Sequence, residues 1–105
     1  MKLIRDRIPE IIERAGKWCL CRRVCGRDEH IVMLKRKMVE EVDELIREPS
    51  YEEAADVFEV LREFANIYDL EMDEIRRVAD DKREKRGGFS KGIILQNVGD
   101  TDESR

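Results

Sequence analysis

The sequence predicts an all-α protein of the helical-hairpin or four-helix-bundle type, with a short N-terminal helix and an extended C-terminal tail. Charged residues make up 44% of the chain and aromatic residues only 6%, a composition typical of helices with much exposed surface. Apolar residues recur at intervals of three and four through two long segments, as in helices that bury one face. The 105 residues are expected to form a single domain, residues 1–105, with a modest core.

Residues that start or stop helices set the expected boundaries. A short helix is predicted over 8–16, because Pro9 suits its first turn and Gly16 its C-terminal end. Asp28 is the expected N-cap of a long helix over about 29–47.

Pro49 and Ser50 form the predicted turn before a second long helix over about 51–68. Asp69 is expected to cap a third long helix over about 70–86, which Gly87 and Gly88 end. The tail contains a β-like patch from Gly92 to Leu95, and residues 97–105 are expected to be frayed.

Apolar residues outside the main stripes indicate that the bundle is completed by a second copy of the chain. Val39, Ile46, Val60 and Phe64 lie outside the narrowest apolar arcs of the two long helices. A second apolar face on each helix favours a homodimer or homotetramer. The alternative is that these residues cover the short helix and the tail.

Charge and hydropathy exclude several classes of protein. The net charge is −4 with both signs interleaved, so neither a nucleic-acid footprint nor a membrane-surface protein is indicated. No apolar run approaches the ~20 residues of a membrane span. Charges interrupt the N-terminus at once, unlike a signal peptide. The chain is therefore expected to be cytoplasmic.

The cysteines are expected to be reduced residues used as small apolar side chains. Cys19, Cys21 and Cys25 lie in a segment without helical periodicity. Structural zinc sites usually pair cysteines two to four residues apart, so a Cys-x-Cys pair fits one tetrahedral ion poorly. The odd number also argues against a disulfide framework.

Two short acidic motifs predict a metal site. Glu41 and Glu44 lie three residues apart before the predicted turn, and Glu53 and Asp56 lie three apart after it. If the two helices fold back as an antiparallel hairpin, the four carboxylates converge. Converging carboxylates repel one another unless a divalent cation is present.

Helix geometry supports this convergence. The apolar stripe of the first long helix consists of Ile31, Leu34, Met38, Val42 and Leu45. Glu41 lies roughly 60–70° around the helix from the centre of this stripe, and Glu44 roughly 120–130° to the same side. Glu53 and Asp56 fall roughly 90–150° to the same rotational side of the second stripe, so both pairs are expected at one edge of the interface. A tight turn would pair Glu44 with Glu53, and Glu41 with Asp56. The apolar residues of the second stripe are Ala54, Val57, Phe58, Leu61, Ala65 and Tyr68.

Two simpler interpretations stand beside the metal site. Charged residues next to an apolar stripe are usually a solvated flank. Ser50 and Glu53 also form a capping box, in which the Glu53 side chain would reach back to the start of its helix. Capping and metal binding compete for this one carboxylate.

Four blocks of the sequence resemble a known family. In order they are Leu3–Ile12, Lys37–Leu45, Glu52–Leu61 and Arg86–Gly92, and the resemblance extends from Leu3 to about Leu95. They are similar to the all-α nucleotide pyrophosphohydrolase superfamily, and more closely to small MazG-like proteins often labelled phosphoribosyl-ATP pyrophosphohydrolase-like. The short gap between Glu44 and Glu53 and the Cys-rich segment depart from that pattern.

The resemblance implies an activity and a role for each matched residue. The enzymes of this superfamily cleave nucleoside triphosphates between the α and β phosphates, giving a monophosphate and pyrophosphate. Mg²⁺, with Mn²⁺ as a possible substitute, would bind the four acidic residues, and Glu41 or Glu44 would orient the attacking water. The cationic residues expected to bind the polyphosphate are Arg5, Lys37, Lys82 and Arg86.

Three alternatives remain open at this point. One is hydrolysis of phosphoribosyl-ATP, the second is a non-catalytic helical module for nucleotide binding or dimerisation, and the third is a purely structural hairpin. House-cleaning of non-standard nucleotides is the favoured form of the enzyme hypothesis. The sequence does not specify base, sugar or the number of metal ions.

Overall fold

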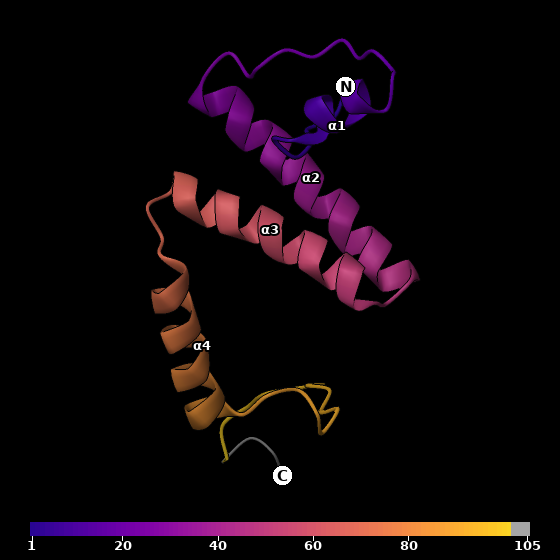
Figure 1. Cartoon of the computed structure of the whole chain (residues 1–105). Helices are drawn as coiled ribbons and strands as arrows, with labels where there is room; N and C mark the ends of the chain where they lie inside the picture. Colours follow the sequence, from indigo (N-terminus) through magenta and orange to yellow (C-terminus); the bar gives the residue numbers. More distant parts are fainter. Residues whose placement is uncertain (102–105) are drawn as a thin grey trace. The chain divides into compact units, whose positions relative to one another are not determined.

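The computed structural model describes residues 1–101, which contain four helices and no β-strand (Figure 1). The prediction of an all-α fold is confirmed, whereas the β-like patch at Gly92–Leu95 forms no strand. Residues 102–105, the end of the tail predicted to be frayed, lie outside the described residues. The helices are α1 (Ile8–Arg14), α2 (Arg27–Arg47), α3 (Tyr51–Ile67) and α4 (Met72–Arg86).

Backbone contacts divide the chain into two units. The first is Met1–Met72 and the second begins at Asp73. Within the second unit, α4 ends as predicted at Gly87, which has φ +82° and donates its N–H to the Arg83 carbonyl at 2.8 Å. None of the helices within residues 1–101 combines the length and apolarity that crossing a membrane requires.

The first unit is built on an antiparallel hairpin of α2 and α3 (Figure 1). Its open end is joined by Arg27 at the start of α2, which donates a hydrogen bond to the Ile67 carbonyl at 3.2 Å. The same guanidinium lies 5.2 Å from the centre of the Tyr68 ring, a cation–π contact. The start of α2 therefore meets the end of α3, as the predicted hairpin requires.

Two of the predicted helix ends are confirmed in detail. The Ser50 hydroxyl accepts the Glu53 N–H at 3.1 Å, so Ser50 is the N-cap of α3. Gly16 follows α1 with φ +77°, and the next N–H, that of Lys17, donates to the Ile12 carbonyl at 3.2 Å. This bond back across the last turn is the pattern by which glycine ends a helix.

Two predicted N-caps are wrong. Helix α2 begins at Arg27, so Asp28 lies inside its first turn. Its negative charge still interacts favourably with the positive end of the helix dipole there. Asp69 ends α3 instead of starting α4: it adopts φ +57°, and the following Leu70 N–H donates to the Ala65 carbonyl at 2.8 Å. Aspartate tolerates this left-handed conformation and so serves at helix ends of either kind.

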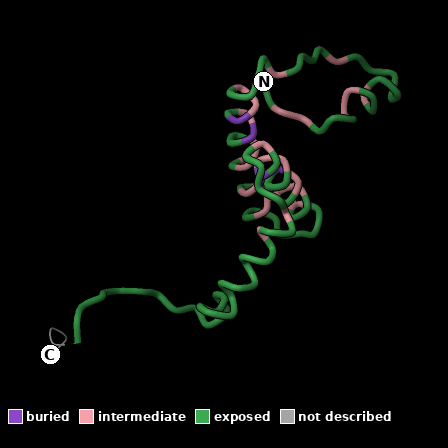
Figure 2. Tube along the Cα trace, turned by 90° about the vertical axis from the view of Figure 1, so that its left-hand side faces the viewer, coloured by how far each residue is buried: buried purple, intermediate pink, exposed green. Residues whose placement is uncertain are grey.

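The core of the hairpin is small (Figure 2). No large side chain in residues 1–101 is completely enclosed, and Leu34, at 2% exposure, comes closest among the apolar ones larger than alanine. The buried residues are Ile31, Leu34, Glu41, Val60 and Ala65. A carboxylate thus belongs to the core, where burial of an unpaired charge is costly.

The predicted apolar stripe of α3 is correct at Val57 and Ala65, but most of the buried and half-buried face is displaced from it by about one residue of rotation, ~100°. The buried and half-buried face of α3 carries Val57, Val60, Phe64 and Ile67, whereas Phe58 and Leu61 of the predicted stripe are 40% and 37% exposed. Ala54 and Tyr68 are exposed as well. Both stripes have helical spacing, so periodicity alone does not choose between them.

The cysteines are not packed as apolar side chains. Cys21 and Cys25 are exposed and Cys19 is half-buried, all three as free thiols. Their segment is tied to α2 by polar contacts instead: Arg22 donates two hydrogen bonds to Glu29, at 2.7 and 2.9 Å, and the Cys25 N–H donates to Glu29 at 2.9 Å. The prediction of small apolar cysteines is wrong for Cys21 and Cys25.

This tie predicts a pH-dependent contribution to stability. The hydrogen bonds from Arg22 and from the Cys25 N–H lower the pKa of Glu29 from 4.5 to about 2. The stabilisation is therefore fully present above about pH 4.5 and is lost as the pH falls through about 2. We expect the difference in unfolding free energy between wild type and Glu29→Gln to shrink across that window. A difference that stays constant from pH 6 to pH 2 would contradict this assignment.

Candidate metal centre

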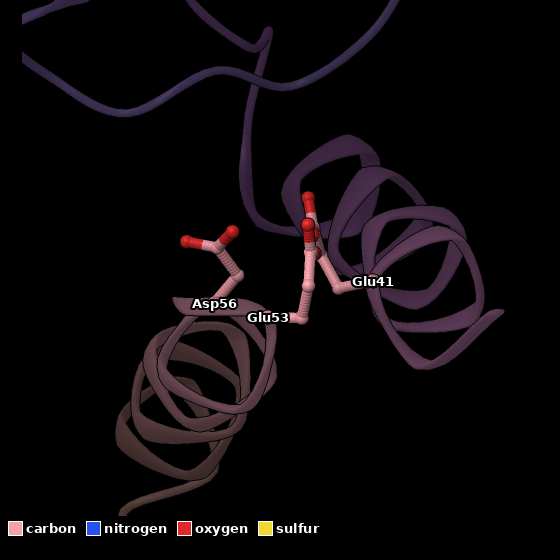
Figure 3. A group of neighbouring side chains, drawn as sticks. All are labelled: Glu41, Glu53 and Asp56. Atoms are coloured by element: carbon pink, nitrogen blue, oxygen red, sulfur yellow. The ribbon is translucent and has the colours of Figure 1, made fainter. Parts of the chain in front are cut away.

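Three carboxylates from the two hairpin helices meet in one place. Glu41 comes from α2, and Glu53 and Asp56 come from α3 (Figure 3). One oxygen of each lies within 4.8 Å of the others. In Figure 3 the Glu41 and Glu53 side chains extend side by side, with the Asp56 carboxylate beside them.

The rotation of α3 explains why these residues meet. Glu53 lies one turn before Val57 on the half-buried face, so its side chain faces α2 instead of lying on the outer edge. Glu41 is only 6% exposed and occupies the face of α2 that contains Leu34 and Leu45. The acidic group therefore lies within the helix interface, closer to its centre than the sequence geometry predicted.

Two oxygens of this group lack hydrogen-bond partners. Oε2 of Glu41 and Oε2 of Glu53 are buried, and neither has a partner. The hydrogen bond at the start of α3 joins the Ser50 hydroxyl to the Glu53 N–H and does not involve the Glu53 carboxylate. This carboxylate therefore remains free to bind a cation. Buried polar atoms are normally satisfied, so these two oxygens are the positions at which a bound cation or a water would be accepted.

Lys37 provides part of the charge compensation. Its ammonium lies 3.2 Å from Oε1 of Glu41, one turn away on α2, and 3.5 Å from Oε1 of Glu40. Partial burial disfavours the charged ammonium, but the hydrogen bond to Glu41 and the charges of both glutamates outweigh it, so the pKa of Lys37 is raised. Lys37 therefore remains a cation beside the buried carboxylate.

Arg5 provides the second cation, from a distant part of the sequence. Its guanidinium lies 2.7 Å from Oδ1 of Asp56, which is 51 residues away. The segment before α1 is therefore joined to α3 at the acidic group. The sequence placed Arg5 among polyphosphate-binding residues and gave no indication of this contact, because no local periodicity links the two segments.

Three further site residues were predicted, Glu44, Lys82 and Arg86. Glu44 is half-buried one turn after Glu41 on α2, outside the group of three. Lys82 and Arg86 are exposed on α4 in the second unit. Their predicted contact with a polyphosphate stays a prediction.

The donor set fits a hard divalent cation. All three residues offer carboxylate oxygens, the ligands that Mg²⁺ and Mn²⁺ prefer over nitrogen or sulfur. Two cations face three carboxylates, and Lys37 is shared with Glu40, so negative charge is left over. A cation bound at the unpartnered oxygens of Glu41 and Glu53 would give the largest electrostatic stabilisation, because these oxygens are buried.

No protein-family model matches this chain, and no solved structure matches it.

Proposed function

We propose that the protein is a Mg²⁺-dependent nucleoside triphosphate pyrophosphohydrolase of the MazG-like kind, which releases a nucleoside monophosphate and pyrophosphate. The cytoplasm is the proposed compartment, and the removal of non-standard nucleotides is the proposed role. The observation that carries the proposal is the buried Glu41, whose Oε2 has no partner and lies beside Glu53 and Asp56. A solvated acidic flank would leave these oxygens to water.

The residues divide into three roles. Glu41, Glu53 and Asp56 would hold the cation, with Glu44 available one turn away on α2. When bound, Mg²⁺ supplies charge neutralisation for the phosphate oxygens. Glu41 or Glu44 would orient the attacking water and accept its proton. Lys37 pairs with Glu41 and Arg5 with Asp56, and these two cations are proposed to bind the polyphosphate.

The reaction is tested by product analysis. The wild-type chain is incubated with a panel of standard and modified nucleoside triphosphates and with phosphoribosyl-ATP, with and without Mg²⁺. We expect pyrophosphate and nucleoside monophosphate to be released in equal amounts, and only when Mg²⁺ is present. The nucleotide that is hydrolysed fastest would identify the preferred substrate. Release of inorganic phosphate and a diphosphate would contradict cleavage between the α and β phosphates. Absence of turnover on every substrate would favour a non-catalytic nucleotide-binding or dimerisation module.

The variant that accompanies this assay is Asp56→Asn, with Glu52→Gln as its control. Glu52 is an exposed acid in the first turn of α3, so its loss changes the net charge equally without touching the acidic group. We expect Asp56→Asn to lose pyrophosphate release and Glu52→Gln to keep it.

We further propose that the chain forms a homodimer or homotetramer. Val32, Val39 and Ile46 are spaced seven residues apart on α2 and are 45%, 71% and 72% exposed. This spacing keeps them on one side of the helix, while α3 leaves Phe58 and Leu61 partly exposed as well. With so small a core, burial of these side chains against a second copy would add the missing apolar contact.

Oligomerisation predicts a change in mass on charge substitution. In sedimentation equilibrium we expect wild type and the control Ala55→Glu to have the mass of a dimer or tetramer. Ala55 is exposed on α3 and is not one of the apolar residues of the proposed interface, and its substitution adds the same charge as Val39→Glu. Val39→Glu is expected to shift the chain toward monomer, because a buried unpaired carboxylate is costly. A monomeric wild type at all concentrations would overturn the proposal.

A further inference from the structure

The segment between α1 and α2 holds two cysteines that are already in contact. The Cys21 thiol lies 3.6 Å from the Cys19 sulfur and donates a hydrogen bond to it. Residues two apart in an extended chain face the same side, which explains how such near neighbours in sequence meet. Neither thiol is enclosed by the core, since Cys21 is exposed and Cys19 half-buried.

The third cysteine of the segment has different contacts. The Cys25 sulfur lies 3.7 Å from Nη1 of Arg22. The Cys25 N–H is bound to Glu29 at the start of α2, and Arg22 is bound to the same carboxylate. Within the described residues, the three sulfurs do not come together in a group of metal-ligand size. The role of the Cys19–Cys21 pair can therefore be tested independently of Cys25 by single substitutions.

We propose that Cys19 and Cys21 are a redox-active dithiol that closes to an intramolecular disulfide by exchange with small-molecule or protein disulfides. The two sulfurs are 3.6 Å apart, whereas a disulfide bond is about 2.0 Å long. Closure therefore requires only a local movement of the segment. Exposure gives an external disulfide access to Cys21. The proposal is independent of the metal centre.

The exchange has two balanced steps. The Cys21 thiolate attacks one sulfur of the external disulfide, forming a mixed disulfide and releasing one external thiolate. The Cys19 thiolate then attacks the Cys21 sulfur, forms the Cys19–Cys21 bond and releases the second external thiolate. Both thiolates take up the protons that the cysteines lost, so the protein is oxidised by two electrons and the external disulfide is reduced. Cys21 is the more exposed of the two thiols and so is assigned the attack on the external disulfide, while the half-buried Cys19 beside it is assigned the second step.

The test is a redox titration of the full chain in buffers of reduced and oxidised glutathione. The samples are quenched with acid, alkylated and analysed by mass spectrometry. We expect the oxidised chain to lose two hydrogens, carry a Cys19–Cys21 link and retain an alkylated Cys25. The ratio of closed to open chain is expected to follow the buffer reversibly.

Variants separate the pair from the third thiol. Cys25→Ser is expected to close as wild type does, whereas Cys19→Ser is expected to accumulate glutathione on Cys21, since the resolving thiol is missing. A wild-type chain that stays reduced, accumulates stable glutathione adducts or links through Cys25 would overturn the proposal. Retention of Zn²⁺ by the reduced pair with no closure would equally overturn it, in favour of a metal role.

Discussion

Glu41→Gln is expected to remove both Mg²⁺-dependent stabilisation and pyrophosphate release while leaving the metal-free fold intact. The substitution keeps the size of the side chain but removes one charge from three carboxylates that lie within 4.8 Å of one another. Relief of that repulsion is expected to offset the loss of the ion pair with Lys37, so the metal-free melting temperature should change little. Loss of a cation ligand is expected to lower turnover by about 10²-fold or more, because bound metal supplies several kcal/mol of charge stabilisation.

The matched control for this variant is Glu40→Gln. Glu40 is the other partner of Lys37, at 3.5 Å, but is not a member of the acidic group. Thermal melts of both variants with and without Mg²⁺, together with pyrophosphate assays, separate the two positions. A Glu41→Gln chain that gains the same thermal shift from Mg²⁺ as wild type would show that the buried carboxylate is not a ligand.

Arg5→Gln is expected to change metal affinity and substrate affinity in opposite directions. In the metal-free chain Arg5 pairs with Asp56 at 2.7 Å, so it competes with a cation for that carboxylate. Partly exposed ion pairs contribute about 0–1 kcal/mol, so its removal is expected to tighten Mg²⁺ binding by up to ~5-fold. Loss of a charged hydrogen bond to the polyphosphate is expected to raise KM by ~10-fold or more.

Arg7→Gln is the control for Arg5. Arg7 is an exposed arginine of the same segment, at the start of α1, and its substitution changes the net charge equally. Calorimetric titration with Mg²⁺ and steady-state kinetics give the two affinities separately. If Arg5→Gln weakened Mg²⁺ binding, the arginine would be holding Asp56 in place for the cation instead of competing with it.

Local signals in the sequence predicted most of the hairpin. Ser50 and Gly16 are in fact at helix ends, because a hydroxyl cap and a left-handed glycine act within one turn of the chain. Asp69 was misassigned because the same residue type suits both the start of a helix and a left-handed helix end. Adjacent signals of this kind are resolved only by the tertiary structure.

The candidate site was predictable in its composition but less so in its geometry. The acidic motifs indicated the right part of both helices, yet the rotation of α3 places Glu53 with Glu41 and leaves Glu44 outside the group. Apolar residues at helical spacing occur on both faces of α3, so periodicity did not determine this rotation. The Arg5–Asp56 contact spans 51 residues, and such contacts depend on chain path, which composition and spacing do not encode.

Direct titration of the divalent cation tests the central claim of this account, that Glu41, Glu53 and Asp56 form a metal site. Mn²⁺ is titrated into the full chain and the free ion is measured by electron paramagnetic resonance, for wild type, Glu53→Gln and the exposed control Glu52→Gln. We expect saturable binding in wild type and the control, displacement by Mg²⁺, and an affinity at least ~10-fold weaker in Glu53→Gln. Equal binding by all three proteins, or no saturable binding by wild type, would contradict the account.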